Sequence, residues 1–161
     1  MWTLLLAGLA HALTPQELVG TWQLDLAASQ PVDALLEAAG MGWVERTALA
    51  KLPITQVIRI EGADLTVLLD TPVGDRTERL PLAGEVKRGR TKEGEPWELR
   101  AGFEGAWLHT TMSVELAEGR RVFTIRRGLE AEGTVLRQKL ELVAPGKPPL
   151  KADRIFRKVG A

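Results

Sequence analysis

The strongest constraint on this chain is an alternation of apolar and polar side chains that begins at residue 54 and continues almost to the end. Between residues 136 and 142, even positions carry leucine or glutamine and odd positions carry charge. A strand with this pattern has one face in a core and the other in water. Turns containing glycine or proline separate about ten such stretches. The pattern predicts an all-β, antiparallel barrel of up-and-down topology, although the alternation alone also fits a sandwich.

A helical segment interrupts the strands after the first of them, which is expected over residues 19–27. Pro31 favours a helix start, because a residue in the first turn needs no backbone N–H donor. The apolar residues that follow have helical spacing, at Val32, Leu35, Leu36 and Ala39. Residues 43–50 indicate a second short helix, which Pro53 ends. A helix-turn-helix between the first two strands favours the barrel over the sandwich and predicts a lid over one mouth.

Composition excludes several classes of function. The chain has 161 residues, of which 45% are hydrophobic, which predicts a single domain with a sizeable core. Lys and Arg balance Asp and Glu at 21 each, so the charge gives no reason to expect a nucleic-acid partner. The absence of cysteine excludes disulfides, thiolate metal sites and a cysteine nucleophile.

The N-terminal segment MWTLLLAGLAHA is apolar but shorter than the roughly 20 residues that span a bilayer. It ends in Ala-His-Ala, which is typical of a signal-peptidase site, although a positively charged start is missing. We therefore predict a signal peptide over residues 1–12, a mature domain over residues 13–161 and a periplasmic or secreted location. An unprocessed cytoplasmic chain is the alternative. No stable membrane insertion is expected.

Four stretches in a fixed order resemble one family of lipid-binding barrels. They are Gly20-Thr21-Trp22, VDALLEAAGMGWVERTALAKLPITQVIRI, EGADLTVLLDTPVGDRTERLPLAGE and ADRIFRKV. These stretches are similar to those of the fatty-acid-binding proteins, the intracellular lipid-binding branch of the calycin superfamily. The resemblance covers nearly the whole chain after the first dozen residues. It implies a lipocalin-like barrel, expected to be a monomer, that binds a fatty acid inside beneath a helical lid.

The resemblance also implies a site for the ligand's carboxylate. In this family an arginine on the eighth strand, another on the last strand and a tyrosine two residues later hold it, and these positions match Arg127, Arg154 and Phe156. A carboxylate taken out of water needs a cationic partner, and a guanidinium can bind both of its oxygens. The chain has no tyrosine, so the hydroxyl of that set is missing. The candidates to replace it are Thr110, Thr124 and Thr134.

Further residues complete the predicted site. Besides the two arginines, the residues expected to contact the ligand are Met112, Gln138, Leu140 and Phe156. Met41 and Trp43, in a glycine-flanked turn of the lid, are expected to form a portal. Glycine before a large aromatic residue allows close backbone approach, so Gly20 and Trp22 are expected to close one end of the barrel.

Two structural alternatives compete with this site. Arg127 could instead stack on Trp22 at the barrel floor, and a slip of one residue would place Arg126 inside in its stead. The barrel could also be filled by its own large side chains, such as Met112, Phe123 and Phe156. The protein would then be an envelope structural or interaction module.

Candidate catalytic groups are scarce. His109 is expected opposite the more apolar face of its strand, which favours a surface or packing role, and haem ligation is its only functional alternative. No carboxylate cluster has metal-ligand spacing, and no serine lies in a nucleophile elbow. We therefore predict a protein that is not an enzyme, needs no metal or cofactor, and carries a fatty acid or a similar small hydrophobic anion.

Overall fold

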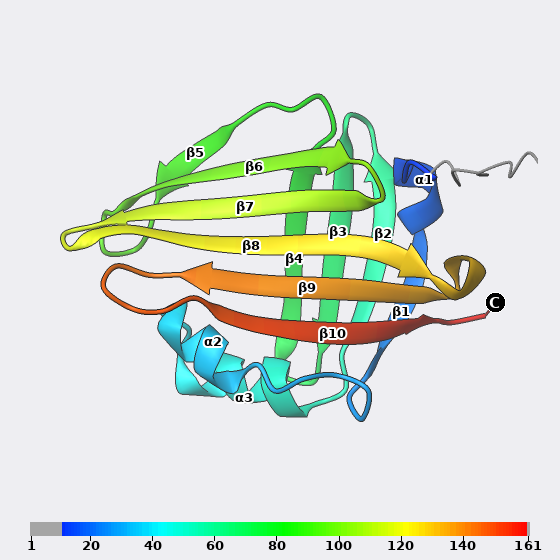
Figure 1. Ribbon diagram of the computed structural model, residues 1–161, viewed down its shortest axis with the longest axis horizontal. Helices are drawn as coiled ribbons and strands as arrows, with labels where there is room; N and C mark the ends of the chain where they lie inside the picture. The colour runs from blue at the N-terminus through cyan, green and yellow to red at the C-terminus, as the bar shows by residue number, and fades with distance from the viewer. Residues whose placement is uncertain (1–10, 161) are drawn as a thin grey trace, which may run out of the picture.

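The computed structural model describes residues 11–160, and Figure 1 shows them as one curled antiparallel sheet with short helices at both ends. The strands are β1 (Gly20–Asp25), β2 (Thr55–Glu61), β3 (Asp64–Thr71), β4 (Gly74–Pro81), β5 (Lys87–Arg90), β6 (Pro96–Glu104), β7 (Trp107–Leu116), β8 (Gly119–Glu130), β9 (Val135–Val143) and β10 (Leu150–Lys158). The helices are α1 (Pro15–Leu18), α2 (Asp33–Ala38), α3 (Trp43–Lys51) and the 3-10 turn η1 (Ala131–Gly133). The predicted all-β barrel with a helical pair between its first two strands is confirmed.

The strands run in the order β4-β3-β2-β1-β10-β9-β8-β7-β6-β5, so the first strand lies beside the last. In Figure 1, β6 to β10 form one layer, and β2 to β4 form a second layer that crosses behind it. β4 and β5 are the edges of the sheet, and in the described chain no ladder joins them. Lys87 Nζ crosses the gap to the carbonyl of Arg79 at 3.0 Å. Pro81, which has no N–H to donate to a further strand, ends the edge strand β4.

Trp22 closes the end of the barrel that lies opposite the helical pair. Its side chain has no exposed surface, and its indole Nε1 donates a hydrogen bond of 2.9 Å to the carbonyl of Leu18 in α1. Lys158 Nζ lies 5.4 Å from the ring centroid, within the range of a cation–π contact. Lys158, rather than Arg127, therefore covers this tryptophan. Gly20 has a φ of 150°, and a Cβ there would lie 3.2 Å from Lys158 Cε.

Three elements differ from the sequence expectation. α1 is too short for an apolar period to reveal it, and its signal is local, a capping box between Thr14 and Glu17. α2 begins at Asp33 rather than directly at Pro31. β1 is shorter than the expected 19–27, because a turn in which the N–H of Ala28 donates to Asp25 Oδ1 follows Asp25.

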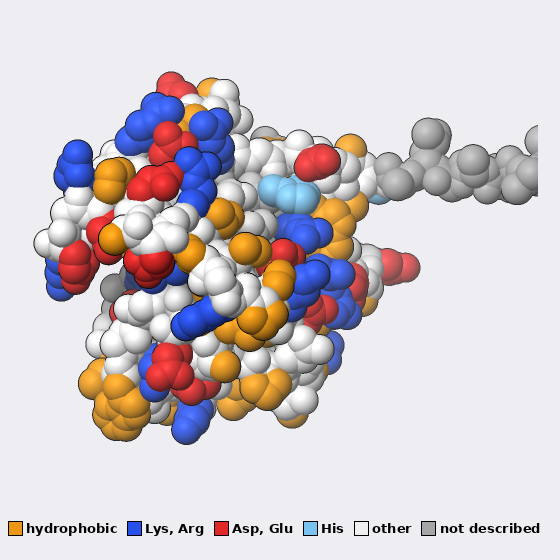
Figure 2. Space-filling model, turned by 60° about the vertical axis from the view of Figure 1, so that its left-hand side comes forward, with side chains coloured by type: hydrophobic (Ala, Val, Ile, Leu, Met, Phe, Trp, Pro, Cys, Tyr) orange, Lys and Arg blue, Asp and Glu red, His pale blue; other side chains and the backbone are white. Residues whose placement is uncertain are grey.

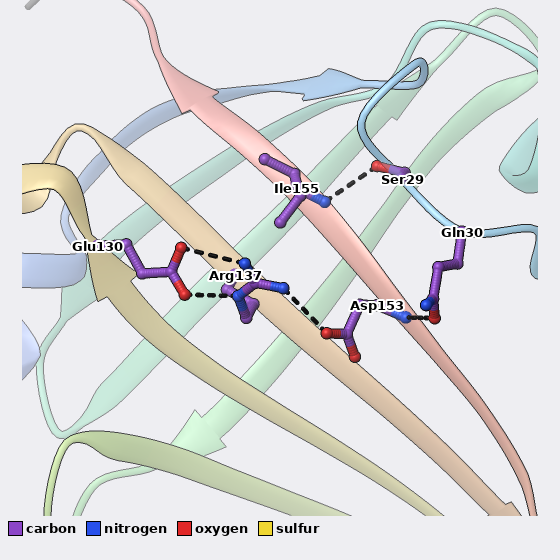
Figure 3. Close-up of polar contacts among 6 residues, drawn as sticks. All are labelled: Ser29, Gln30, Glu130, Arg137, Asp153 and Ile155. Atoms are coloured by element: carbon purple, nitrogen blue, oxygen red, sulfur yellow. Dashed lines mark hydrogen bonds and ion pairs between the residues drawn. The ribbon is translucent and has the colours of Figure 1, made fainter.

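The segment between β1 and the helical pair is fastened to β10, as Figure 3 shows. The N–H of Ile155 donates to Ser29 Oγ at 2.9 Å, and the N–H of Asp153 donates to Gln30 Oε1 at 2.8 Å. On the same strand, the Asp153 carboxylate accepts a hydrogen bond of 2.9 Å from Arg137, which also contacts Glu130. The lid is thus attached to the barrel on its N-terminal side by backbone hydrogen bonds.

The predicted signal segment, residues 1–12, lies almost entirely outside the described residues. Leu13, the first residue of the predicted mature domain, is buried and donates its N–H to the carbonyl of Gly105 at 3.0 Å. Within residues 11–160, no helix is long and apolar enough to cross a membrane. Figure 2 shows Lys and Arg side chains mixed with Asp and Glu over the visible face, in keeping with the balanced charge.

We predict that Trp22→Phe lowers the free energy of unfolding by about 1–3 kcal/mol, because it removes a buried hydrogen bond and leaves a small cavity. The matched control is Trp43→Phe, since Trp43 is 71% exposed and should tolerate the change almost without effect. Urea denaturation of the three proteins checks this. Equal losses in the two variants would show that Trp22 does not hold the barrel end together.

Candidate functional site

A cavity of about 280 Å³ lies inside the barrel, next to the helical pair. Its walls are mainly apolar, and they come from the lid as well as from the strands of both layers. The apolar lining is Leu36, Met41, Leu49, Ile54, Leu69, Leu99, Met112, Phe123, Ile125, Leu140 and Phe156. Met112, Phe123 and Phe156, the three large side chains that the side-chain-filled alternative would place in the interior, line this cavity.

Three polar side chains enter this cavity from one row across the sheet. Gln138 on β9 pairs with Arg127 on β8 and, on its other side, with Arg154 on β10. Directly paired residues of antiparallel strands point to the same face, so all three point inward. Arg127 is 2% exposed and Arg154 is 6% exposed. Two guanidinium groups are thus taken out of water on either side of one amide.

Arg127 is held by partners from the opposite layer. Its Nε donates to Gln56 Oε1 on β2, and its Nη2 donates to Glu78 Oε2 on β4, each at 3.2 Å. Gln56 Nε2 donates in turn to Gln138 Oε1 at 3.1 Å. Arg127 therefore has a carboxylate counter-ion and belongs to a hydrogen-bonded network that spans the interior.

Arg154 has no such counter-ion among the described residues. Its Nε and Nη2 are buried without a hydrogen-bond partner, and its guanidinium carbon lies 6.0 Å from the centroid of the Phe156 ring. Burial lowers the pKa of Arg154 to about 10, because the low-dielectric interior penalises the charged form. The side chain is still protonated at neutral pH, so it brings an unneutralised positive charge into an apolar cavity.

Two further donors in the same cavity also lack partners in the described chain. They are Arg127 Nη1 and the hydroxyl of Thr110 on β7, which is 3% exposed. A buried donor without an acceptor costs free energy, so several of them in one cavity favour a ligand that accepts hydrogen bonds. Of the three threonines considered from the sequence, Thr134 donates to the carbonyl of Ala131, and Thr124 does not line the cavity.

Other residues singled out from the sequence have different positions. Arg126 lies outside and contacts Glu141 at 3.6 Å, so it does not replace Arg127. His109 pairs with Arg126 in the ladder and shares that outer face, away from the cavity lining. Met41 lines the cavity. Trp43 does not, and lies instead in a separate surface hollow with Val73.

Sequence reasoning did not single out Gln56 and Glu78 for this site. Gln56 lies between Ile54 and Ile58 on the inward face of β2, and a polar residue on an apolar face was the available signal. Glu78 shares its parity with the buried Leu80 on a strand that otherwise appears polar. Within residues 11–160 no group of His, Cys, Asp and Glu side chains is arranged to hold a metal ion.

Comparisons with known proteins identify the fold. No family model and no curated protein matches the sequence. The structure is similar to apo Caenorhabditis elegans lipid binding protein 8, with 16% identity, a TM-score of 0.71 and coverage of 91% of this chain and 99% of that one. The Schistosoma mansoni fatty acid binding protein in complex with arachidonic acid has 17% identity and a TM-score of 0.66, with coverage of 89% of this chain and 97% of that one. The fatty acid-binding protein of Drosophila melanogaster brain has 21% identity and a TM-score of 0.65, with coverage of 86% of this chain and 98% of that one. The chain therefore has the fold of the fatty-acid-binding and intracellular lipid-binding proteins.

We predict that Arg154→Met raises the free energy of unfolding of the ligand-free protein by about 1–3 kcal/mol, because it removes a buried charge that has no partner. The matched control is Arg157→Met, whose guanidinium is exposed and bound to Asp25 at 2.7 Å, and which should be neutral or slightly destabilising. Urea denaturation after delipidation gives both values. A loss of stability in Arg154→Met similar to that of a core truncation would contradict this account.

The difference in the free energy of unfolding between Arg154→Met and wild type is also expected to depend on pH. The pKa of Arg154 is about 10 in the folded protein, which is lower than that of an arginine in the unfolded chain. The folded state therefore releases this proton at a lower pH than the unfolded state does. The loss of stability caused by the buried charge is fully present below about pH 10 and becomes smaller as the pH rises above that value. The stability advantage of Arg154→Met over wild type should narrow between about pH 9 and pH 11. A constant difference over that interval would show that desolvation of the charge is not the cause.

Proposed function

We propose that this protein is a non-catalytic carrier that binds a fatty acid, or a similar small hydrophobic molecule with an anionic head group, inside the barrel. One observation carries the proposal. Arg154 brings an unneutralised charge and two unpaired donor atoms into a cavity with mainly apolar walls. An amphipathic anion satisfies both features of the cavity, because its head group neutralises the charge and its tail is removed from water.

The head group would be held mainly by Arg154 and Thr110. Arg154 Nε and Nη2 can donate to the two oxygens of one carboxylate, as guanidinium groups do in bidentate pairs. Thr110 supplies the hydroxyl that tyrosine would otherwise provide, because Phe156 occupies that position and contributes only its ring. Gln138 lies between the two arginines across the sheet, so a bound head group would also be close to its amide.

The tail would lie against the lid and the apolar walls. A volume of about 280 Å³ is near the lower end of the range for small-molecule pockets, so the proposed ligand is small or only partly enclosed. Each Å² of tail surface that leaves water contributes roughly 25 cal/mol. Affinity would therefore increase with tail length until the cavity is filled.

Entry would occur between the lid and the turn that joins β3 to β4. Met41 lines the cavity from the lid, while Trp43, Val44 and Val73 are exposed beside it. In Figure 2 hydrophobic side chains gather at this helical end of the molecule. Arg76 Nη1 and Glu45 Oε1, 2.8 Å apart, connect β4 to α3 and would have to separate if the lid lifts. The predicted signal segment supports a location outside the cytoplasm for the proposed carrier, and the family resemblance supports a monomer.

We predict that full-length, delipidated protein binds a fluorescent fatty acid saturably, that unlabelled oleate displaces it, and that Arg154→Met weakens oleate binding about 10- to 100-fold. The same substitution is expected to stabilise the ligand-free protein, so loss of binding cannot be attributed to unfolding. Arg157→Met, with its exposed arginine, is the control and should bind normally. Unchanged affinity in Arg154→Met, or no binding by the wild type, would refute the carrier.

A further inference from the structure

Glu78 is the one carboxylate that reaches the cavity lining within the described residues. It lies on β4, an edge of the sheet, and its partner Arg127 lies on β8 in the other layer. The contact of 3.2 Å therefore crosses the interior and does not follow a ladder. The Glu78 side chain is 27% exposed, whereas that of Arg127 is 2% exposed, so the carboxylate neutralises the guanidinium from the side of the gap.

The charged side chains that line the cavity leave one positive charge without a partner. Two other lining arginines have carboxylate partners at the surface, Arg76 with Glu45 and Arg79 with Glu61, and more than half of each arginine side chain is exposed. The charges that remain inside are those of the buried Arg127 and Arg154 and of the partly exposed Glu78. One positive charge is cancelled by Glu78, and the interior retains a single positive charge, located at Arg154.

We propose that Glu78 is a specificity residue that limits the bound head group to one negative charge, so that the barrel selects hydrophobic carboxylates over hydrophobic phosphates. This inference rests on the proposed function. A monoanion neutralises Arg154 and leaves no excess charge in the cavity. A dianion would place a second negative charge in a low-dielectric space. Arg127 could not neutralise it, because Glu78 already neutralises Arg127, and like charges in such a space repel strongly.

The chemistry of Glu78→Gln makes the proposal testable. Glutamine has the same shape and keeps an oxygen that can accept the Arg127 hydrogen bond, but it removes the negative charge. The cavity would then hold two positive charges, a better match for a phosphate monoester, which carries nearly two negative charges at pH 8 because its second pKa is about 6. Binding of both ligand classes is expected to tighten, and that of the dianion more.

The experiment measures displacement of a fluorescent fatty acid by dodecanoate and by dodecyl phosphate at pH 8, using full-length protein. The readout is the ratio of the two dissociation constants, in which general effects on folding largely cancel. Wild type should prefer dodecanoate, and Glu78→Gln should shift the ratio toward dodecyl phosphate by about tenfold or more. Glu115→Gln, which removes the partner of exposed Arg120 outside the cavity lining, is the matched control and should leave the ratio unchanged.

A second variant covers the case in which Glu78→Gln does not fold because Arg127 is left without a counter-ion. Arg127→Gln keeps the charge of Glu78 but removes its partner, so the interior holds no net positive charge and the ratio should shift further toward dodecanoate. Adding Glu78→Gln to this variant restores a single interior positive charge and should return the ratio to the wild-type value. If wild type prefers dodecyl phosphate, or if the ratio stays constant across these variants, Glu78 does not set the charge of the head group. If wild type binds neither ligand, the proposed function itself fails.

Discussion

The pairing of β1 with β10 is the constraint on which the interior depends. These strands are some 130 residues apart, and their ladder joins Trp22 to Lys158 and Leu24 to Phe156. It brings the layer that carries Gln56 and Glu78 over the layer that carries Arg127 and Arg154. The cross-barrel network cannot form in a flat sheet, because its members lie on strands that are not neighbours. Closure of the fold and assembly of the polar cavity are therefore the same event.

The interior of this barrel is less stable than it could be. Arg154, Thr110 and one nitrogen of Arg127 are buried with unmet hydrogen bonds in the described chain, where apolar residues of similar size would cost nothing. A buried charge without a partner lowers the stability of the fold, so we expect it to be kept only where another interaction offsets that loss. A ligand that binds the folded state alone would offset this cost by an amount that grows with the logarithm of its concentration relative to its Kd. The polar groups thus fit a binding protein better than a barrel that serves only as a structural module.

The sequence predicts the architecture well because strand parity and turn residues are local signals. The alternation from residue 136 to residue 142 fixes which face of β9 is buried, and Pro81 marks the sheet edge. The same parity places Arg127 and Arg154 inward. What parity cannot show is which inward residues meet across the cavity, since that depends on the curl of the sheet. For this reason the partners of Arg127, Gln56 and Glu78, appear only in three dimensions, as does Lys158 over Trp22.

The two arginines illustrate how one residue type acquires different roles from its surroundings. Both are buried and both are neighbours of Gln138, yet Arg127 has a carboxylate and an amide as partners, whereas Arg154 has the face of a phenyl ring. The first is a fixed part of the fold, because removing it would strand Glu78 and Gln56. The second has no carboxylate partner among the described residues, and in the proposed function its donors bind the anion. One strand, β9, lies between the two arginines, and the counter-ion that the chain supplies to Arg127 alone distinguishes them.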